Sequence, residues 1–133
     1  MSFGQRNFDL DREKPEIDFP GADVPTELKI IDEIEGTGSE VKRGSHVTTH
    51  YVGVAFSSGE EFDASWNRGQ PLEFTAGIGQ VIQGWDEGLL GMKVGGRRRL
   101  EIPSNLAYGE HGAPPAIGPN EALIFVVDLL AVR

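Results

Sequence analysis

Two pairs of titratable residues have side chains that could do chemistry, but neither has the spacing that the chemistry needs. His46 and His50 lie on the same face of an alternating stretch, and four residues of strand place them about 13 Å apart. That separation is too long for one shared metal ion, so we expect both histidines to face solvent. Asp86 and Glu87 are adjacent on a predicted helix, where neighbours point apart, so they do not form an acid–base pair.

Two further patterns resemble binding motifs without their context. Gly77, Gly79 and Gly84 come close to a phosphate-binding glycine fingerprint, but the third glycine is displaced and no parallel βαβ unit surrounds it. Residues 97–99 are all arginine, yet strand alternation sends them to opposite faces of a protein with net charge −9. Nucleic acid is therefore not an expected partner. No grouping of serine, histidine and acid indicates a hydrolase.

The remaining candidate is a set of aromatic side chains on separate stretches of the chain: Tyr51, Phe62, Trp85, Tyr108 and Phe125. Three aliphatic residues accompany them in the pattern: Val81, Ile82 and Ile117. One carboxylate, Asp63, directly follows an aromatic residue. A helix lying on a sheet could gather these residues at one interface. Trp85 then either fills the core, as large aromatics on an apolar stripe usually do, or forms the floor of an apolar cavity.

A short helix at residues 83–92 is the element that must position Trp85. Its apolar side chains recur at steps of three, four and three, which is one stripe on a helix: Ile82, Trp85, Leu89 and Met92. Gly84 and Gly88 each weaken the helix by roughly 1 kcal/mol relative to alanine. A helix this short is not stable alone in water, so it must pack against strands.

Strand patterns occupy most of the remaining chain, at residues 28–34, 46–54, 61–62, 72–75, 97–102 and 121–132. The last stretch is apolar on both parities, so we expect it at the centre of the sheet. Residues 63–71 and 104–120 are predicted to be loops. Five or six antiparallel strands with one short helix on one side define an α+β fold.

Composition excludes several classes of protein. The 133 residues suffice for one domain with its own core. No apolar run approaches the length of a membrane span, so no membrane partner is expected. The chain has no cysteine, which excludes disulfides and thiol catalysis. The N-terminus also lacks the apolar region of a secretory signal. We therefore expect a cytoplasmic monomer.

The first 25 residues differ from the rest of the chain. Residues 1–25 are rich in charge and proline, and their apolar residues follow no helical or strand period. Such a segment cannot form a core of its own. It is either a flexible tail or an extended arm that docks on the domain through Ile17 and Phe19. The folded domain is expected to span residues 26–133.

Several linked motifs resemble the FKBP-type peptidyl-prolyl isomerases, with matching order and spacing from about residue 28 to residue 132. The motifs are His50-Tyr51-Val52-Gly53, Gly59 to Ser65 (GEEFDAS), Val81 to Gly88 (VIQGWDEG), Ile102-Pro103 with Ala107-Tyr108-Gly109, and Leu123-Ile124-Phe125. Any one of them would be a weak signal, but together and in register they are specific. The resemblance implies a half-open antiparallel sheet wrapped across one short helix, with an apolar pocket between them.

The resemblance also implies roles for individual residues. Trp85 is expected beneath the proline ring of a substrate. The pocket walls are expected to be Tyr51, Phe62, Leu72, Val81, Ile117 and Phe125. The Ile82 N–H and the Tyr108 hydroxyl would hydrogen-bond substrate carbonyls, and Asp63 would lie at the rim, where Tyr51 and Arg68 can orient it. The expected catalytic residues are thus Asp63, Tyr108, Phe125 and Ile82.

The sequence departs from the family pattern at the rim of the expected pocket. Leu72 occupies a wall position that is often aromatic, Gln80 stands where an acid is common, and Ala113 where some members carry a histidine. These changes bear on substrate preference and macrolide affinity more than on activity. Trp66 has two interpretations, because it could cover the pocket edge or pack locally.

Three functions are compatible with these residues. The first is isomerisation of X-Pro bonds in polypeptides, which needs no metal and no cofactor, with rapamycin-like macrolides as competing ligands. The second is a non-catalytic module that binds proline-containing peptides or macrolides. The third is a holding chaperone, but family members of that kind carry an inserted domain before the last strand, and residues 104–120 are too few to hold one.

Overall fold

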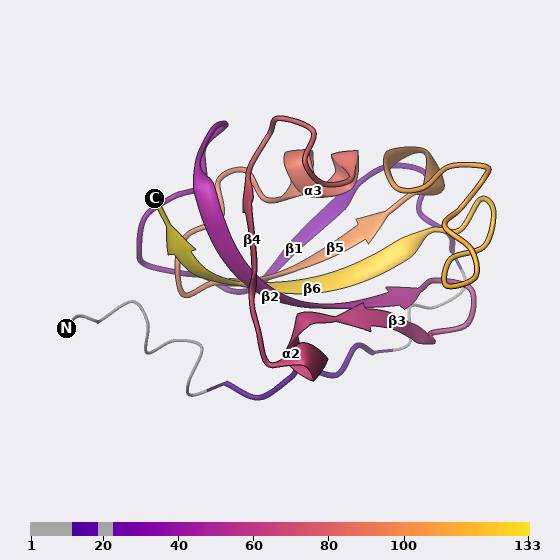
Figure 1. Ribbon diagram of the computed structural model, residues 1–133, viewed down its shortest axis with the longest axis horizontal. Helices are drawn as coiled ribbons and strands as arrows, with labels where there is room; N and C mark the ends of the chain where they lie inside the picture. The colour runs from indigo at the N-terminus through magenta and orange to yellow at the C-terminus, as the bar shows by residue number, and fades with distance from the viewer. Residues whose placement is uncertain (1–11, 19–22) are drawn as a thin grey trace.

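The alternating and apolar stretches of the sequence form one antiparallel sheet. The computed structural model describes residues 12–18 and 23–133. Within them the strands are β1 (Lys29–Ile34), β2 (His46–Ala55), β3 (Glu61–Ala64), β4 (Leu72–Thr75), β5 (Arg97–Ile102) and β6 (Leu123–Val132). Their order across the sheet is β1-β5-β6-β2-β3, and β4 also pairs with β2. Figure 1 shows this strongly twisted sheet curving around a short helix, which confirms the predicted α+β class.

Strand β6 lies at the centre of the sheet, as its sequence, apolar on both parities, predicts. It pairs with β5 along one side and with β2 along the other. The first eight of its ten residues are buried, because both faces of this strand are covered. Aromatic and aliphatic side chains from its inner face, including Phe125, therefore point toward the helix.

The outer edge of β2 is shared by two short strands with a break between them. Strand β4 pairs with β2 at residues 46–49, and β3 pairs with it at residues 52–54. The single-turn helix α2 (Ser65–Arg68) follows β3 directly and leads toward β4. The prediction of a loop at residues 63–71 is thus wrong in part. A helical turn of four residues is too short to show a periodic pattern, so the sequence gives no signal for it.

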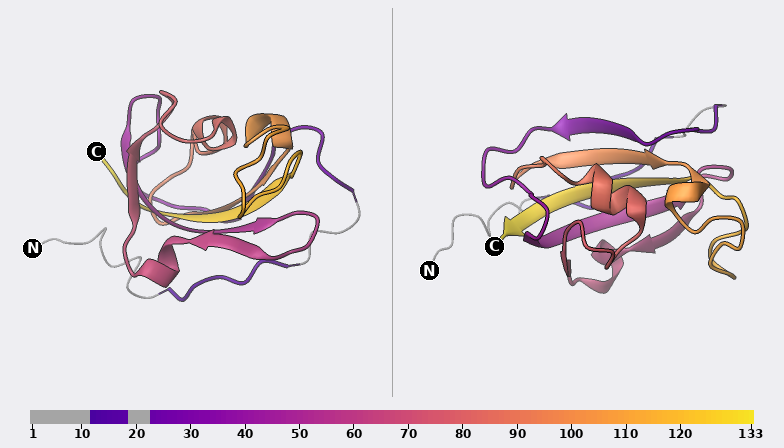
Figure 2. Two further views of the ribbon diagram at one scale, coloured as in Figure 1. Left: turned by 45° about the vertical axis from the view of Figure 1, so that its right-hand side comes forward. Right: turned by 90° about the horizontal axis from the view of Figure 1, so that it is seen from above.

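Helix α3 (Gln83–Gly88) crosses the concave face of the sheet (Figure 2). It ends four residues earlier than the predicted 83–92. Gly91 has φ +84, a left-handed conformation that favours glycine and turns the chain back. The buried guanidinium of Arg98 donates to the carbonyls of Gly88 and Leu90 at 2.8 and 3.0 Å, so a strand side chain satisfies acceptors at the helix C-terminus.

The glycines of α3 allow the helix to approach β5 closely. A Cβ on Gly84 would lie 2.6 Å from Ile102 Cγ2, and a Cβ on Gly88 would lie 2.8 Å from Leu100 Cδ2. Side chains at these positions would push helix and sheet apart. The helix propensity that these glycines sacrifice is therefore offset by packing against β5.

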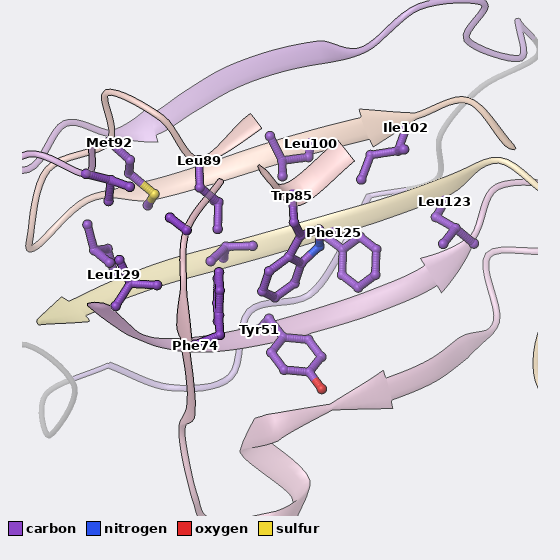
Figure 3. Packing of buried hydrophobic residues seen from close by; sticks show 14 of the residues in the cluster. Tyr51, Phe74, Trp85, Leu89, Met92, Leu100, Ile102, Leu123, Phe125 and Leu129 are labelled. Atoms are coloured by element: carbon purple, nitrogen blue, oxygen red, sulfur yellow. The ribbon is translucent and has the colours of Figure 1, made fainter. Parts of the chain in front are cut away.

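The main core fills the space between α3 and the sheet (Figure 3). Trp85, Leu89 and Met92 of the predicted stripe are all buried. They pack against side chains of β2, β4, β5 and β6: Val47, Tyr51, Phe74, Leu100, Ile102, Phe125, Val127 and Leu129. The fourth residue of the stripe, Ile82, is only partly buried and lies at the margin of this core.

A second, smaller core lies apart from this main cluster. It consists of Val54, Phe56, Ala122 and Ile124, and Ile17 packs against it. The docked-arm alternative is therefore right for Ile17, whereas Phe19 lies outside the described residues. Figure 1 shows residues 12–18 running past α2 and β3. None of the helices in the described part of the chain has the length and apolar character needed to cross a membrane.

Candidate active site

An open cavity of about 260 Å³ lies between α3, the inner face of the sheet and the loops at one end of it. Strands and helix contribute Tyr51, Phe62, Asp63, Leu72, Trp85 and Phe125. The two neighbouring loops contribute Gln80, Val81, Ile82 and Tyr108. The cavity is thus mostly aromatic and aliphatic, with one carboxylate and one exposed tyrosine hydroxyl at its margin.

Trp85 is the centre of the aromatic cluster. Its ring meets Tyr51 edge to face at 5.1 Å between centroids, and Phe125 at 5.2 Å. Phe74 supports it from β4 at 5.6 Å, and Phe62 meets Phe125 at 5.5 Å with perpendicular planes. Only 3% of Trp85 is exposed, yet it lines the cavity. Trp85 is therefore both a core residue and the floor of the cavity, which are the two interpretations that the sequence allowed.

The indole N–H of Trp85 is buried and has no hydrogen-bond partner among the described residues. In Figure 3 the indole nitrogen lies on the side of the ring that faces Phe125. The planes of these two rings are perpendicular, at 88°, which is a preferred arrangement for an aromatic pair. The floor of the cavity is therefore held in place by ring packing, without a hydrogen bond from the indole N–H among the described residues.

Asp63 is held at the rim by two donors. The Tyr51 hydroxyl donates to Asp63 Oδ2 at 2.5 Å, and Arg68 Nη1 donates to Asp63 Oδ1 at 2.6 Å. Arg68 Nη2 also donates to the Tyr51 oxygen at 2.9 Å. These three side chains form a closed network, which we call the rim network.

The rim network determines which groups are charged. Burial works to raise the pKa of Asp63, but the hydrogen bonds from Tyr51 and Arg68 outweigh it, so this pKa lies below its usual value. Burial and the bond to Asp63 raise the pKa of Tyr51. At neutral pH the site therefore contains an ionised carboxylate and a protonated phenol.

Two hydrogen-bond donors at the cavity are not used within the described part of the chain. Tyr108 is 41% exposed, and its hydroxyl has no partner there; burial and the nearby charge of Asp63 raise its pKa, so it remains a donor. The N–H of Ile82, the residue that directly precedes α3, also lacks a partner among the described residues. Both groups can therefore donate to a bound molecule.

Nine of the eleven residues selected from the sequence line this cavity, and two do not. Ile117 is buried in the core beside it, and Arg68 reaches the site through its bonds to Asp63 and Tyr51. Gln80, regarded only as a departure from the family pattern, also lines the cavity. Its Oε1 accepts the Thr75 N–H at 2.8 Å and ties the approaching loop to β4.

Asp86 has a role at the site that the sequence analysis missed. Its carboxylate accepts the N–H groups of Gly77 and Gly79 at 2.9 and 2.8 Å. Both glycines have positive φ, so two successive bends of the loop converge on one carboxylate. The N–H groups of this glycine pattern therefore bind a carboxylate of the chain itself and not a phosphate. It shapes the loop that delivers Val81 and Ile82 to the cavity.

The expectation that His46 and His50 both face solvent is wrong for His50. Alternation does place His50 opposite Tyr51, but α2 covers that position. The imidazole stacks on Trp66 at 4.3 Å between centroids and is 8% exposed. Trp66 thus packs locally against β2 and does not line the cavity. His46 is more accessible, and its Nε2 lies 3.0 Å from Glu73 Oε1.

Comparison with known proteins agrees with the fold. Residues 38–130 match the family model of the FKBP-type peptidyl-prolyl cis-trans isomerases. An FK506-binding protein of Streptomyces anulatus is 63% identical over 121 residues, which cover 90% of this chain and 98% of that protein. An FK506-binding protein of Neisseria meningitidis serogroup B is 52% identical over 105 residues, covering 79% and 95%.

A solved structure shows the same relationship in three dimensions. The crystal structure of AtFKBP13 superposes with a TM-score of 0.75 at 38% identity, covering 83% of this chain and 96% of that one. The chain described here therefore belongs to the FKBP-type peptidyl-prolyl cis-trans isomerase family. This finding confirms the resemblance that the linked motifs indicate.

Proposed function

We propose that this protein is a peptidyl-prolyl cis-trans isomerase that accelerates X-Pro isomerisation during protein folding. The observation that carries the proposal is the ring-lined cavity over Trp85, with an ordered carboxylate at its rim. A concave, mostly apolar cavity with a few polar groups at its margin is typical of a small-molecule site rather than an extended interface. We place the isomerase in residues 26–133, acting as a cytoplasmic monomer on proline-containing polypeptides.

The cavity supplies the physical requirements of the reaction. Rotation about a peptide C–N bond meets a barrier of about 18–20 kcal/mol, because rotation breaks the amide resonance. Resonance makes the planar amide more dipolar than the twisted one. An apolar, water-poor site therefore destabilises the planar form more than the twisted form. That difference is preferential binding of the transition state, obtained through desolvation.

Two fixed donors orient the substrate while its amide bond turns. The Ile82 N–H and the Tyr108 hydroxyl hydrogen-bond carbonyls on either side of the proline ring. They hold the flanking chain in the turned conformation that the transition state requires, which lowers the entropic part of the barrier. Phe125, Phe62, Val81 and Leu72 enclose the ring, and Ile117 supports this wall from the core.

Asp63 acts through its charge and not as a proton donor. Its lowered pKa keeps it ionised at neutral pH, and Arg68 compensates part of the charge. A carboxylate in this state cannot protonate the prolyl nitrogen. It instead fixes the Tyr51 ring as a wall and contributes a negative field at the rim, beside the amide whose charge distribution changes during rotation.

The same cavity is proposed to bind rapamycin-like macrolides. The names of the relatives from Streptomyces anulatus and Neisseria meningitidis support this proposal, because an apolar ring of a macrolide would occupy the position of proline. Leu72 and Gln80, which line this cavity, and Ala113, which packs against the core, differ from common family residues. We expect competition between macrolide and substrate, with an affinity that depends on these three positions.

Refolding of a protein whose slow phase is X-Pro isomerisation tests the proposal. Catalytic amounts of this protein should accelerate that phase, and a rapamycin-like macrolide should abolish the acceleration. The Asp63→Ala variant, once confirmed as folded, should accelerate that phase less than the wild type does. If the slow phase is unchanged while macrolide or proline peptide still binds, the alternative of a non-catalytic binding module is correct.

A further inference from the structure

The edge of the sheet is interrupted beside the candidate active site. Strands β3 and β4 pair with β2 on either side of residues 50 and 51, and α2 occupies the interval between them. A continuous neighbouring strand would satisfy the backbone of Tyr51, but a helical turn cannot do so in the same way. The group that hydrogen-bonds the Tyr51 backbone in place of a strand also determines where α2 lies.

Ser65 replaces the missing strand. Its Oγ is fully buried, accepts the Tyr51 N–H at 2.7 Å, and shares a hydrogen bond with His50 Nδ1 at 2.8 Å. One hydroxyl thus attaches the first residue of α2 to the backbone of β2. Buried bonds of this kind are costly to lose, because the remaining partner is left unsatisfied.

Trp66 provides the second attachment of α2. Its indole lies nearly parallel to the His50 imidazole, with centroids 4.3 Å apart and planes 18° apart. The pair is on the face of β2 opposite the cavity. The stack restrains the rotation of α2 about the Ser65 attachment, because a hydroxyl alone leaves the turn free to pivot.

Asn67 adds a third contact on the solvent side. Its Nδ2 donates to Glu61 Oε2 at 2.8 Å, and Lys14 of the N-terminal arm donates to Asn67 Oδ1 at 2.9 Å. Lys14 also lies 2.8 Å from Glu61. These groups are largely exposed, so each pair contributes little. The three contacts leave one residue of α2, Arg68, directed at the rim network.

We propose that Trp66 is a positioning residue for the site: its stack on His50 holds α2 so that Arg68 reaches Asp63 and Tyr51 together. Arg68 itself is half-exposed, and its guanidinium carbon lies 5.8 Å from the centroid of the Tyr51 ring, a loose contact that does not direct the side chain alone. A long side chain anchored on a mobile turn would lose its two bonds in most orientations. The proposal rests on the isomerase function only for its kinetic consequence, since the geometry of the rim network can be measured without turnover.

The test compares Trp66→Ala with Trp66→Tyr, which restores an aromatic stack. Carbon NMR titration of the Asp63 carboxyl group reports the rim network directly, because bonds from Tyr51 and Arg68 keep its pKa low. In Trp66→Ala this pKa should rise toward its usual value, and kcat/KM for a proline peptide should fall roughly threefold to tenfold through loss of positioning. Trp66→Tyr should recover both. Ile31→Ala, which removes an exposed apolar side chain from β1, serves as the matched surface control and should change neither.

A double-mutant comparison separates positioning from general destabilisation. In an Arg68→Ala background, Trp66→Ala should change kcat/KM less than about twofold, because the two residues act through one network. An unchanged Asp63 pKa in folded Trp66→Ala overturns the proposal, as does an undiminished kinetic effect in the Arg68→Ala background. Should Trp66→Ala not fold, Trp66→Leu is judged by the same titration. If the wild type itself shows no turnover, the isomerase assignment fails, while the titration still decides the role of Trp66.

Discussion

The indole of Trp85 and the phenyl ring of Phe125 meet at 88° with centroids 5.2 Å apart. One ring comes from α3 and the other from the central strand β6, so this contact joins the two layers of the domain. It also forms the floor and one wall of the cavity. Stability and ligand binding therefore depend on the same pair of side chains.

Substitutions at Phe125 should separate these two contributions. Phe125→Ala should cost about 3–5 kcal/mol of unfolding free energy, because the ring is 4% exposed and leaves a cavity. Phe125→Leu keeps most of the volume and should cost less than about 1.5 kcal/mol, yet catalysed isomerisation should still fall because the wall loses its flat face. Urea denaturation and a peptide isomerisation assay measure the two effects. Wild-type turnover in Phe125→Leu would contradict the proposed wall.

Gly53 should be intolerant of even one methyl group. A Cβ there would lie 2.6 Å from Phe125 Cε1 and 2.7 Å from Phe62 Cζ, so both rings must move. We expect Gly53→Ala to lose about 1–3 kcal/mol of stability and to weaken macrolide binding measured by calorimetry. Gly118→Ala is the matched control, because no atom lies within 4 Å of its added Cβ. Equal affinities of the two variants would show that the rings can yield.

Arg98 should contribute more to stability than any exposed arginine. Its guanidinium is buried and donates to the carbonyls of Gly88 and Leu90 and to Asp32. Because Arg98→Leu leaves those carbonyls unsatisfied, we expect a loss of about 2–4 kcal/mol, measured by denaturant unfolding. Arg133→Ala breaks only an exposed pair with Glu73 and should cost much less, because exposed ion pairs contribute little to stability. Similar losses for both variants would refute a capping role for Arg98.

The rim network should make stability depend on pH in a defined direction. The pKa of Asp63 is lower in the folded chain than its usual value, near 3.9 when unfolded. Its contribution is therefore fully present above that value and disappears as pH falls through the folded-state pKa. Unfolding free energies of wild type and Asp63→Asn, compared from pH 7 to pH 2.5, should converge toward acid. Divergence toward acid would mean that the pKa is raised instead.

Much of the fold could be predicted because its signals are local. The spacing of Trp85, Leu89 and Met92 predicts which face of the helix is buried, and the stretch at residues 121–132, which is apolar on both parities, predicts a central strand. The end of α3 could not be predicted in this way. It depends on Arg98, a residue ten positions away on another strand, whose side chain binds the carbonyls at the C-terminus of the helix.

The residues of the candidate site likewise divide into those that the sequence predicts and those that it does not. The residue types that line the cavity follow from the linked motifs, whereas the roles of Gln80 and Asp86 could be found only from the structure. Their roles depend on backbone N–H groups of Thr75, Gly77 and Gly79, and such contacts have no periodic signature.

By itself the sequence determined the sheet and the buried stripe of the helix, since these follow from the order of apolar and polar residues along the chain. It also determined the set of rings around Trp85, through the linked motifs. Only the tertiary structure decided that His50 is buried, that Trp66 stacks on it, and that Ile17 docks on the second core. The physical reason is that an alternating pattern tells which face of a strand a side chain is on, whereas burial depends on which distant segment covers that face.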